Sequence, residues 1–179
     1  MLSSTETFSL SEQQLREFRR LLAEHRIRAQ VNRYVQLCDA LGPHTLLDEL
    51  LSLFTVDAVW EGRGRLYQAA FGRLSGREEI AAMFRRYMTD TPHFAFNAHF
   101  LCSELIEVDE SGDSARARWL MLQPSTLAGG QSRLSGARLT LDLLRSGETW
   151  LISHFRTENL FNRAIDRWND PDEFQVPQD

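Results

Sequence analysis

Polar and apolar side chains alternate along residues 93–108, HFAFNAHFLCSELIEV, with the two-residue period of a β-strand. The alternation predicts one long, half-buried strand. One face carries Phe94, Phe96, Ala98 and Phe100, and the other carries His93, Ala95, Asn97, His99 and Leu101. A face that mixes two imidazoles and an amide with small apolar groups is typical of a pocket wall. The alternative is an edge strand whose histidines are solvated.

Helical periodicity dominates the first half of the chain. Apolar residues recur at helical spacing from Leu15 to Leu41, which predicts a helix that is either continuous or bent near His25. Ser11 offers a capping box at its start, and the pair Gly42-Pro43 ends it. Further helices are predicted over residues 45–54 and 76–88, with a looser segment over 66–75.

Strand-like alternation returns in the second half, over residues 114–124, 137–145 and 149–160. A short strand is predicted at 59–65, a mobile loop at 125–136, and a short C-terminal helix within 161–174. Helices followed by a run of antiparallel strands indicate the α+β class. The expected fold is a cone-shaped, curved mixed or antiparallel sheet wrapped around N-terminal helices and enclosing a hydrophobic pocket.

Composition narrows the functional classes. The chain has 179 residues, 42% of them hydrophobic, and a net charge of −5, which favours one globular domain and argues against a nucleic-acid partner. Cys38 and Cys102 lack metal-ligand spacing and are expected to be buried thiols, which favours a reducing, cytoplasmic location. The apolar runs are too short to span a membrane, and the polar start is unlike a signal peptide.

Five motifs occur in an order that resembles the SnoaL-like branch of the nuclear transport factor-like superfamily, which includes scytalone dehydratase, ketosteroid isomerase and polyketide cyclases. They are RYVQLCDAL, LLSLFTVDAVWEG, GREEIAAMF, HFLCSELIEVDESGDSARARWLM and TWLISHFR. The resemblance covers Ile27 to Arg156. It implies a SnoaL-like α+β domain over residues 25–168, between an N-terminal helical extension at 1–24 and a tail at 169–179. The extension is expected to cover the pocket mouth or to join a neighbouring subunit.

The resemblance implies that Asp39 and His99 are the acid/base pair and that His154 faces the cavity as a further catalytic residue. The position of Asp39 alone also makes it a candidate site residue, because a carboxylate near a helix C-terminus interacts unfavourably with the helix dipole and needs a partner. A histidine suits that role, since the carboxylate fixes its tautomer and stabilises the imidazolium. The structural alternative is an ion pair with Arg33 or Arg63.

The substrate-binding wall is expected to include Tyr34, Trp60, Asn97, Leu139 and Arg156. Relatives often carry a Tyr and an Asp on the strand at 137–145, where this chain has Leu139 and Leu141, which weakens the case for a tyrosine-assisted mechanism. A metal site built from His93, His99, His154 and Asp39 is conceivable. No closely spaced histidine pair supports it, so neither a metal nor a cofactor is expected.

The predicted function is that of a cofactor-independent lyase or isomerase, of dehydratase or cyclase type, acting on a hydrophobic carbonyl-containing small molecule through the Asp-His pair. The alternative is a non-catalytic ligand-binding or assembly module, such as the small subunit of a ring-hydroxylating dioxygenase. If His99 faces the pocket, the phenylalanines of the same strand face outward. We therefore expect a homo-oligomer, a dimer or trimer, with Phe96 and Phe100 near its interface and Trp119 and Met121 beside them.

Overall fold

The computed structural model describes residues 10–165, which form four helices and seven strands. The helices are α1 (Glu12–Asp39), α2 (Leu47–Ser52), α3 (Gly64–Ala70) and α4 (Gly76–Arg85). The strands are β1 (Phe54–Arg63), β2 (Arg73–Ser75), β3 (Phe94–Asn97), β4 (Phe100–Val108), β5 (Ser114–Leu127), β6 (Ser132–Ser146) and β7 (Thr149–Ile165).

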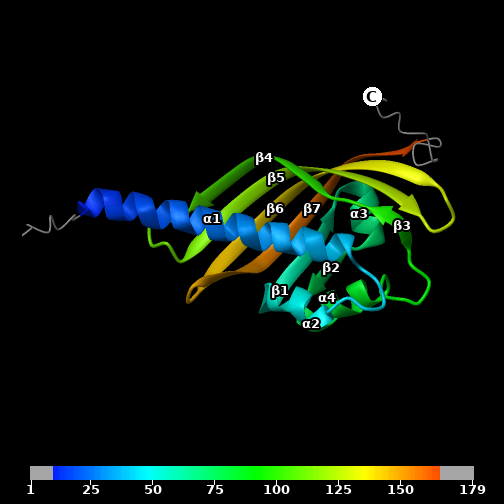
Figure 1. The fold of residues 1–179 in the computed structure, drawn as a ribbon, viewed down its shortest axis with the longest axis horizontal. Helices are drawn as coiled ribbons and strands as arrows, with labels where there is room; N and C mark the ends of the chain where they lie inside the picture. The colour runs from blue at the N-terminus through cyan, green and yellow to red at the C-terminus, as the bar shows by residue number, and fades with distance from the viewer. Residues whose placement is uncertain (1–9, 166–179) are drawn as a thin grey trace, which may run out of the picture.

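The strands form one curved sheet in the order β2-β1-β7-β6-β5, and β3 and β4 both pair with β5. Every pairing is antiparallel except that of β1 with β7. Figure 1 shows α1 crossing one face of this sheet, with α2, α3 and α4 near the end of α1 that carries Asp39. The prediction of an α+β fold with helices against a curved, mostly antiparallel sheet is confirmed.

Helix α1 is a single, unbroken helix of 28 residues, so of the two alternatives left by the sequence, a continuous helix or a bend near His25, the continuous helix is correct. It begins with the expected capping box, in which Ser11 and Gln14 bind each other's backbone N–H groups. Its second half is buried from Ile27 onward, whereas Phe18 and Leu21 in the first half are exposed. The first turns therefore project beyond the tips of the hairpins (Figure 1).

A clamp fixes α1 against the sheet. Arg28 on α1 forms a two-pronged ion pair with Glu104 on β4, with Nη2 and Oε1 2.5 Å apart, and Trp119 Nε1 donates to the same carboxylate at 3.3 Å. The adjacent Ser103 has a φ of 51°, and the register between β4 and β5 shifts between Cys102 and Leu105. This bulge breaks the strand alternation at Glu104.

The core lies between the helices and the inner face of the sheet. Along β6, Leu139, Leu141 and Leu143 are fully buried, and Arg138 and Asp142 alternate with them on the outer face. A second group of fully buried side chains comes from the helices and the strands β1 and β7: Ile27, Val31, Leu50, Phe54, Ile80 and Ile152. No helix within residues 10–165 is long and apolar enough to cross a membrane.

The predicted long strand over residues 93–108 is two strands, β3 and β4, interrupted at Ala98 and His99. A register shift between Phe94 and Phe96 turns Phe94 toward the helices, where it stacks on Tyr87. Phe96 and Phe100 are exposed, at 44% and 59%, as the alternation predicts. Their expected neighbours, Trp119 and Met121, are buried on the inner face; Leu120 and Leu122 are exposed instead, and Leu122 pairs directly with Phe100.

Four further expectations from the sequence were wrong. The looser segment contains a helix, α3, and the predicted loop over 125–136 is mostly strand, because β5 continues to Leu127 and β6 begins at Ser132. Strand β7 runs to Ile165 where a helix was expected, and the rest of that predicted helix lies outside the described residues. Cys102 is an exposed thiol on β4, although Cys38 is buried as expected.

Candidate active site

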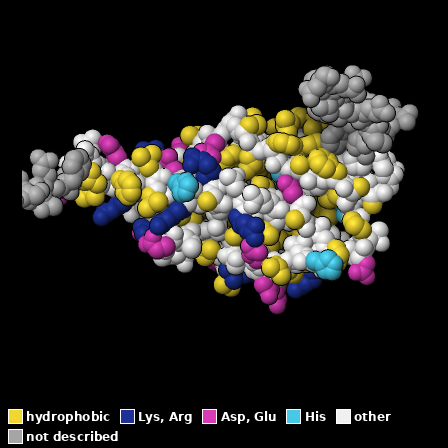
Figure 2. Space-filling view, viewed as in Figure 1, with side chains coloured by type: hydrophobic (Ala, Val, Ile, Leu, Met, Phe, Trp, Pro, Cys, Tyr) yellow, Lys and Arg dark blue, Asp and Glu magenta, His cyan; other side chains and the backbone are white. Residues whose placement is uncertain are grey.

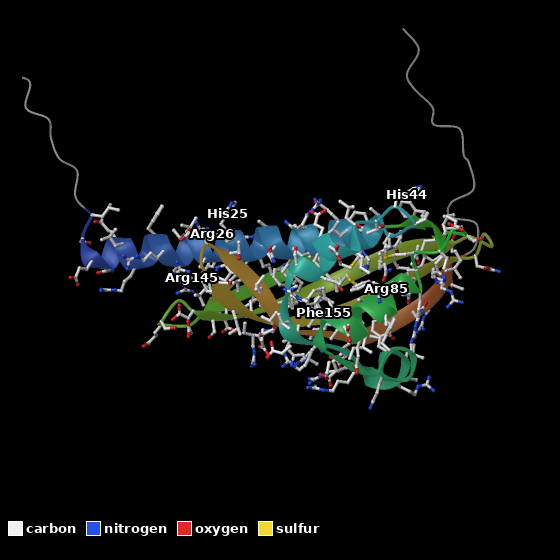
Figure 3. The ribbon with its side chains drawn as sticks, turned by 90° about the horizontal axis from the view of Figure 1, so that it is seen from below. His25, Arg26, His44, Arg85, Arg145 and Phe155 are labelled. Carbon is white, nitrogen blue, oxygen red and sulfur yellow. The ribbon has the colours of Figure 1, made fainter. Side chains whose placement is uncertain are left out.

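A cavity of about 400 Å³ lies between the inner face of the sheet and the helices. Its inner wall is aromatic and aliphatic, and the labelled Phe155 of β7 (Figure 3) stacks on Trp60 and contacts Tyr34. The cavity is also lined by polar side chains of β5, β6 and β7, among them Gln123, Ser135 and Asn162. Such a mixture of a large apolar area and a few polar groups is typical of small-molecule sites.

His99 lies on the wall of this cavity and is gripped by Asp39. Its Nδ1 is 2.5 Å from Asp39 Oδ1, and its backbone N–H donates to Asp39 Oδ2 at 3.2 Å. Because a carboxylate accepts hydrogen bonds, Nδ1 carries the proton of the neutral ring and Nε2 keeps its lone pair. Within residues 10–165, no hydrogen bond or ion pair engages His99 Nε2. The pair is thus arranged as a base with one nitrogen held and the other available.

The local fold explains this grip. Asp39 is the last residue of α1, where the exposed carbonyl ends disfavour a carboxylate and make a donor partner valuable. His99 lies in the gap between β3 and β4, so its N–H is absent from the sheet ladder and can donate to Asp39. The strand break that the sequence pattern missed is therefore what allows His99 to bind both carboxylate oxygens.

Asn97 supports Asp39. Gln123 Nε2 donates to Asn97 Oδ1 at 2.8 Å, and Asn97 Nδ2 donates to Asp39 Oδ1 at 3.4 Å. Asn97 was predicted to bind substrate, and it does lie on the cavity wall, but its amide is engaged by its neighbours. The alternative partners of Asp39 are committed elsewhere, because Arg33 pairs with Glu49 and Arg63 with Glu61.

Three of the predicted substrate-binding residues, Tyr34, Trp60 and Leu139, line the cavity. Trp60 Nε1 donates to the Tyr34 hydroxyl at 3.1 Å, which fixes both aromatic side chains. Burial raises the pKa of Tyr34 well above its usual value, so the phenol stays neutral. Leu141, by contrast, is fully buried in the core and is not part of the cavity wall.

His154 and Arg156, the other two predicted site residues, face away from the cavity. The pattern placed them on one face of β7 with Ile152, but the register between β6 and β7 shifts between Ile152 and His154. The extra residue, Ser153, donates its hydroxyl to the Asp142 carbonyl at 3.0 Å. This bulge leaves Ile152 inside and turns His154 outward, while Phe155 and Thr157 point into the cavity.

On the outer face, both ring nitrogens of His154 are occupied. Arg156 Nη2 donates to Nδ1 at 2.6 Å, and Nε2 lies 3.1 Å from Glu61 Oε2. Arg156 also pairs with Asp142 at 2.7 Å. Burial, and then the charge of Arg156, lower the pKa of His154, so the ring is held neutral. Burial opposes the lowered pKa of Glu61, but hydrogen bonds from Arg63 and His154 outweigh it.

The sequence reasoning missed several cavity residues: Tyr67, Tyr87, Gln123, Arg133 and Ser135. Strand β6 has no tyrosine, but Tyr67 on α3 and Tyr87 in the segment after α4 both line the cavity. Burial raises the pKa of both phenols. Tyr87 shares a helical face with Met83 and Phe84, a spacing that could have revealed it.

His93 contacts the rings of Tyr87 and Phe94. Residues 10–165 contain no group of three His, Cys, Asp or Glu side chains arranged to hold a metal ion.

Solved structures share this fold at low sequence identity. A hexachlorocyclohexane dehydrochlorinase from Novosphingobium barchaimii has a TM-score of 0.67 and 18% identity, covering 90% of this chain and 99% of that chain. A protein from Novosphingobium aromaticivorans assigned as a scytalone dehydratase has a TM-score of 0.70 and 13% identity, covering 83% and 91%. An NTF2-like protein with a cystatin-like fold from the same organism has a TM-score of 0.61 and 25% identity, covering 86% and 92%.

Comparison of the sequence with curated proteins found no match. The model of the SnoaL-like domain, however, matches residues 19–156 of the sequence, which span most of α1, every element from α2 to β6 and the first half of β7, and include the pair Asp39 and His99. The resemblance seen in the motifs is thereby confirmed, and the chain belongs to the SnoaL-like domain family.

Proposed function

We propose that this protein is a cofactor-independent lyase or isomerase that acts on a hydrophobic carbonyl compound, with His99 as the base and Asp39 as its positioning partner. The observation that carries the proposal is the 2.5 Å contact between His99 Nδ1 and Asp39 Oδ1 at the wall of an apolar cavity. A carboxylate in this position holds the tautomer that leaves Nε2 unprotonated and is placed to stabilise the imidazolium that forms when Nε2 takes a proton.

In the first step, Nε2 removes a proton from a carbon next to the substrate carbonyl. The electron pair of the broken C–H bond forms a carbon–carbon double bond, and the carbonyl oxygen takes the negative charge of an enolate. Tyr67 and Tyr87 on the cavity wall are neutral phenols, since burial raises the pKa of each, and they are suited to donate to that oxygen. Proton transfer by a positioned side chain typically contributes about 10²–10⁴-fold in rate.

In the second step, the imidazolium returns its proton. In a lyase the enolate collapses, a hydroxyl on the next carbon leaves, and the proton from Nε2 converts that hydroxyl into water. In an isomerase the same proton is delivered to a different carbon and the double bond moves. Both routes leave His99 neutral and ready for another cycle, and neither consumes an oxidant or a reductant.

The cavity supports a hydrophobic substrate of modest size. Its volume of about 400 Å³ lies within the usual range for small-molecule pockets, and Trp60, Phe71, Phe84 and Phe155 supply apolar wall. The names of two structural neighbours, a dehydrochlorinase and an assigned dehydratase, denote eliminations, for which a base in such a cavity is also suited. At these identities the similarity concerns the fold, so the neighbours serve to choose test compounds.

Deuterium exchange tests the proposed base without knowledge of the leaving group. The protein is incubated in D₂O with a panel of aromatic ketones such as tetralone, and with hexachlorocyclohexane, and mass spectrometry follows deuterium uptake or chloride loss. We expect His99→Gln to lower the rate at least 100-fold, in line with the contribution of a general base, and His154→Gln to leave it unchanged. A wild-type protein that turns over none of the panel, or a fully active His99→Gln, contradicts the proposal.

A further inference from the structure

The cavity carries a single formal charge that the proposed chemistry does not use. Among the cavity-lining residues of the described chain, Arg133 is the one arginine or lysine, and no aspartate or glutamate lines the wall. Asp39 lies behind His99, where its carboxylate accepts two hydrogen bonds from that residue, and it is not part of the cavity lining. A ligand in the cavity therefore faces a cation without a facing anion.

The strand register aims Arg133 inward. Arg133 belongs to the same alternating set of β6 as Ser135, Leu139 and Leu141, which are all buried on the inner face. Its cross-strand partners are Ser125 on β5 and Ala164 on β7, and Ser125 is also a buried cavity residue. Arg133 itself is exposed, so its side chain lies at the rim of the cavity, at the end nearest the β5–β6 turn.

The wall becomes more polar toward Arg133. Leu139 and Phe155 line the inner end of the cavity, whereas Ser125, Ser135 and Asn162 line the part beside Arg133. Ser125 and Ser135 are only 5% and 8% exposed, so their hydroxyls lie in a largely desolvated environment. A cation flanked by buried hydroxyls at one end of an apolar cavity is suited to a ligand with an anionic end and a hydrophobic body.

Arg133 differs from the other arginines of the sheet. On the outer face Arg116, Arg118 and Arg138 pair with Asp142, Glu107 and Glu158, respectively. Within residues 10–165, no carboxylate lies within ion-pairing distance of Arg133. These three arginines of the outer face therefore have counter-ions, whereas Arg133 at the rim of the cavity has none among the described residues.

We propose that Arg133 binds a carboxylate of the ligand, so that the substrate is a hydrophobic carbonyl compound with an anionic end. Gln123, which contacts Asn97 beside the Asp39–His99 pair, is the cross-strand partner of Ser135, and Arg133 precedes Ser135 by two residues. That step is roughly 7 Å along the strand, so an aromatic ring fits between the bound carboxylate and the reacting carbon at His99. The reaction assumed here rests on the proposed function; the carboxylate site itself does not.

A matched pair of probes isolates this site. Naphthoate and its neutral amide, naphthamide, share one hydrophobic body and differ in charge. By titration calorimetry we expect the wild-type protein to bind naphthoate at least tenfold more tightly than naphthamide, which corresponds to about 1.4 kcal/mol. Arg133→Gln should bring the two affinities together, Arg133→Lys should keep part of the preference, and Arg138→Gln, on the outer face of the same strand, should keep all of it.

The outcomes separate this proposal from the proposed reaction, because binding is measured and turnover is not. Equal affinities in the wild type, no detectable naphthoate binding, or a preference that survives Arg133→Gln overturns the carboxylate site. A preference lost in His99→Gln and kept in Arg133→Gln places the anion at His99 and also overturns it. If Arg133→Gln does not fold, added salt serves instead: it should weaken wild-type binding of naphthoate and not of naphthamide, and an equal effect on both contradicts the proposal.

Discussion

His99 and His154 each contact a carboxylate, but they lie on opposite faces of the sheet and in different states of engagement. The ring of His99 binds Asp39 through one nitrogen and presents the other to a cavity, whereas His154 is closed on both sides by Arg156 and Glu61. A histidine beside an acid is therefore not enough to indicate acid/base chemistry. The informative feature is an available nitrogen that faces a space in which a substrate fits.

Backbone irregularities produce the difference. His99 lies in a gap between two strands, where its own N–H is free to bind Asp39. His154 follows a bulge at Ser153 that reverses the face on which it lies, and cross-strand pairing with Val59 and Asp142 places it beside Glu61 and Arg156. One break in the strand pattern thus creates the candidate site, and the other removes a histidine from it.

Replacing the carboxylate beside each histidine with an amide, one variant at a time, should produce the largest difference between the two histidines. Asp39→Asn places an amide against His99 Nδ1, and its NH₂ group favours the tautomer in which Nε2 carries the proton and cannot act as a base. We expect deuterium exchange to fall by about 10²–10⁴-fold. Glu61→Gln is the matched control and should change the exchange rate less than twofold. An equal loss of exchange in both variants would contradict the assignment of the base to the Asp39–His99 pair.

Oligomer formation through the outer face is the second prediction. Phe96, Phe100, Leu120 and Leu122 are exposed on neighbouring strands, and a soluble monomer rarely leaves such a contiguous apolar patch to water. We expect a dimer or trimer that Phe100→Glu dissociates without loss of folded structure, and sedimentation at micromolar concentration measures it. Val56→Glu, an exposed apolar residue on β1, is the control. A monomeric wild type would refute the prediction.

Removing Arg156 tests whether an available nitrogen on His154 is enough for activity, because it frees the Nδ1 of that ring. Arg156→Met deletes the donors to His154 Nδ1 and Asp142 in a region where the Arg156 side chain is only 16% exposed. We expect a loss of about 1–3 kcal/mol in the free energy of unfolding, with no change in deuterium exchange. Arg118→Met removes an exposed ion pair instead and should cost less than about 1 kcal/mol. Urea unfolding measures both.

The smallest expected effect concerns pH. Burial lowers the pKa of His154 in the folded protein, so the unfolded chain binds more protons than the folded one as the pH falls below the ordinary histidine value of about 6.5. The free energy of unfolding should therefore decrease from pH 7.5 to pH 5.5. His154→Gln keeps one donor and one acceptor and should flatten this slope, whereas His44→Gln, in an exposed loop, should not. An unchanged slope in His154→Gln would contradict the assignment.

Predictions from the sequence were most accurate where the hydrophobic periodicity is regular. The apolar stripe of α1 placed Asp39 at the end of a buried helix, and the motifs identified the family. The predictions went astray where one residue is inserted into a strand, because a bulge reverses every side chain after it and leaves little trace in composition. The directions of Phe94 and His154 were missed for that reason. Arg133 was hidden because the segment that contains it resembles a loop in its glycines and serines.

Because the clamp between Arg28 and Glu104 holds α1 at one point, the length of helix beyond it determines where Asp39 lies. Asp39 follows Arg28 by eleven residues on a continuous helix, so the clamp fixes both the height and the rotation of the carboxylate. Deleting one residue between them would turn Asp39 by roughly 100° and draw it back by about 1.5 Å, away from His99. Deleting one residue from the projecting turns before Leu21 would leave that spacing intact. Comparing deuterium exchange in the two deletions tests whether this helix can change length only at its free end.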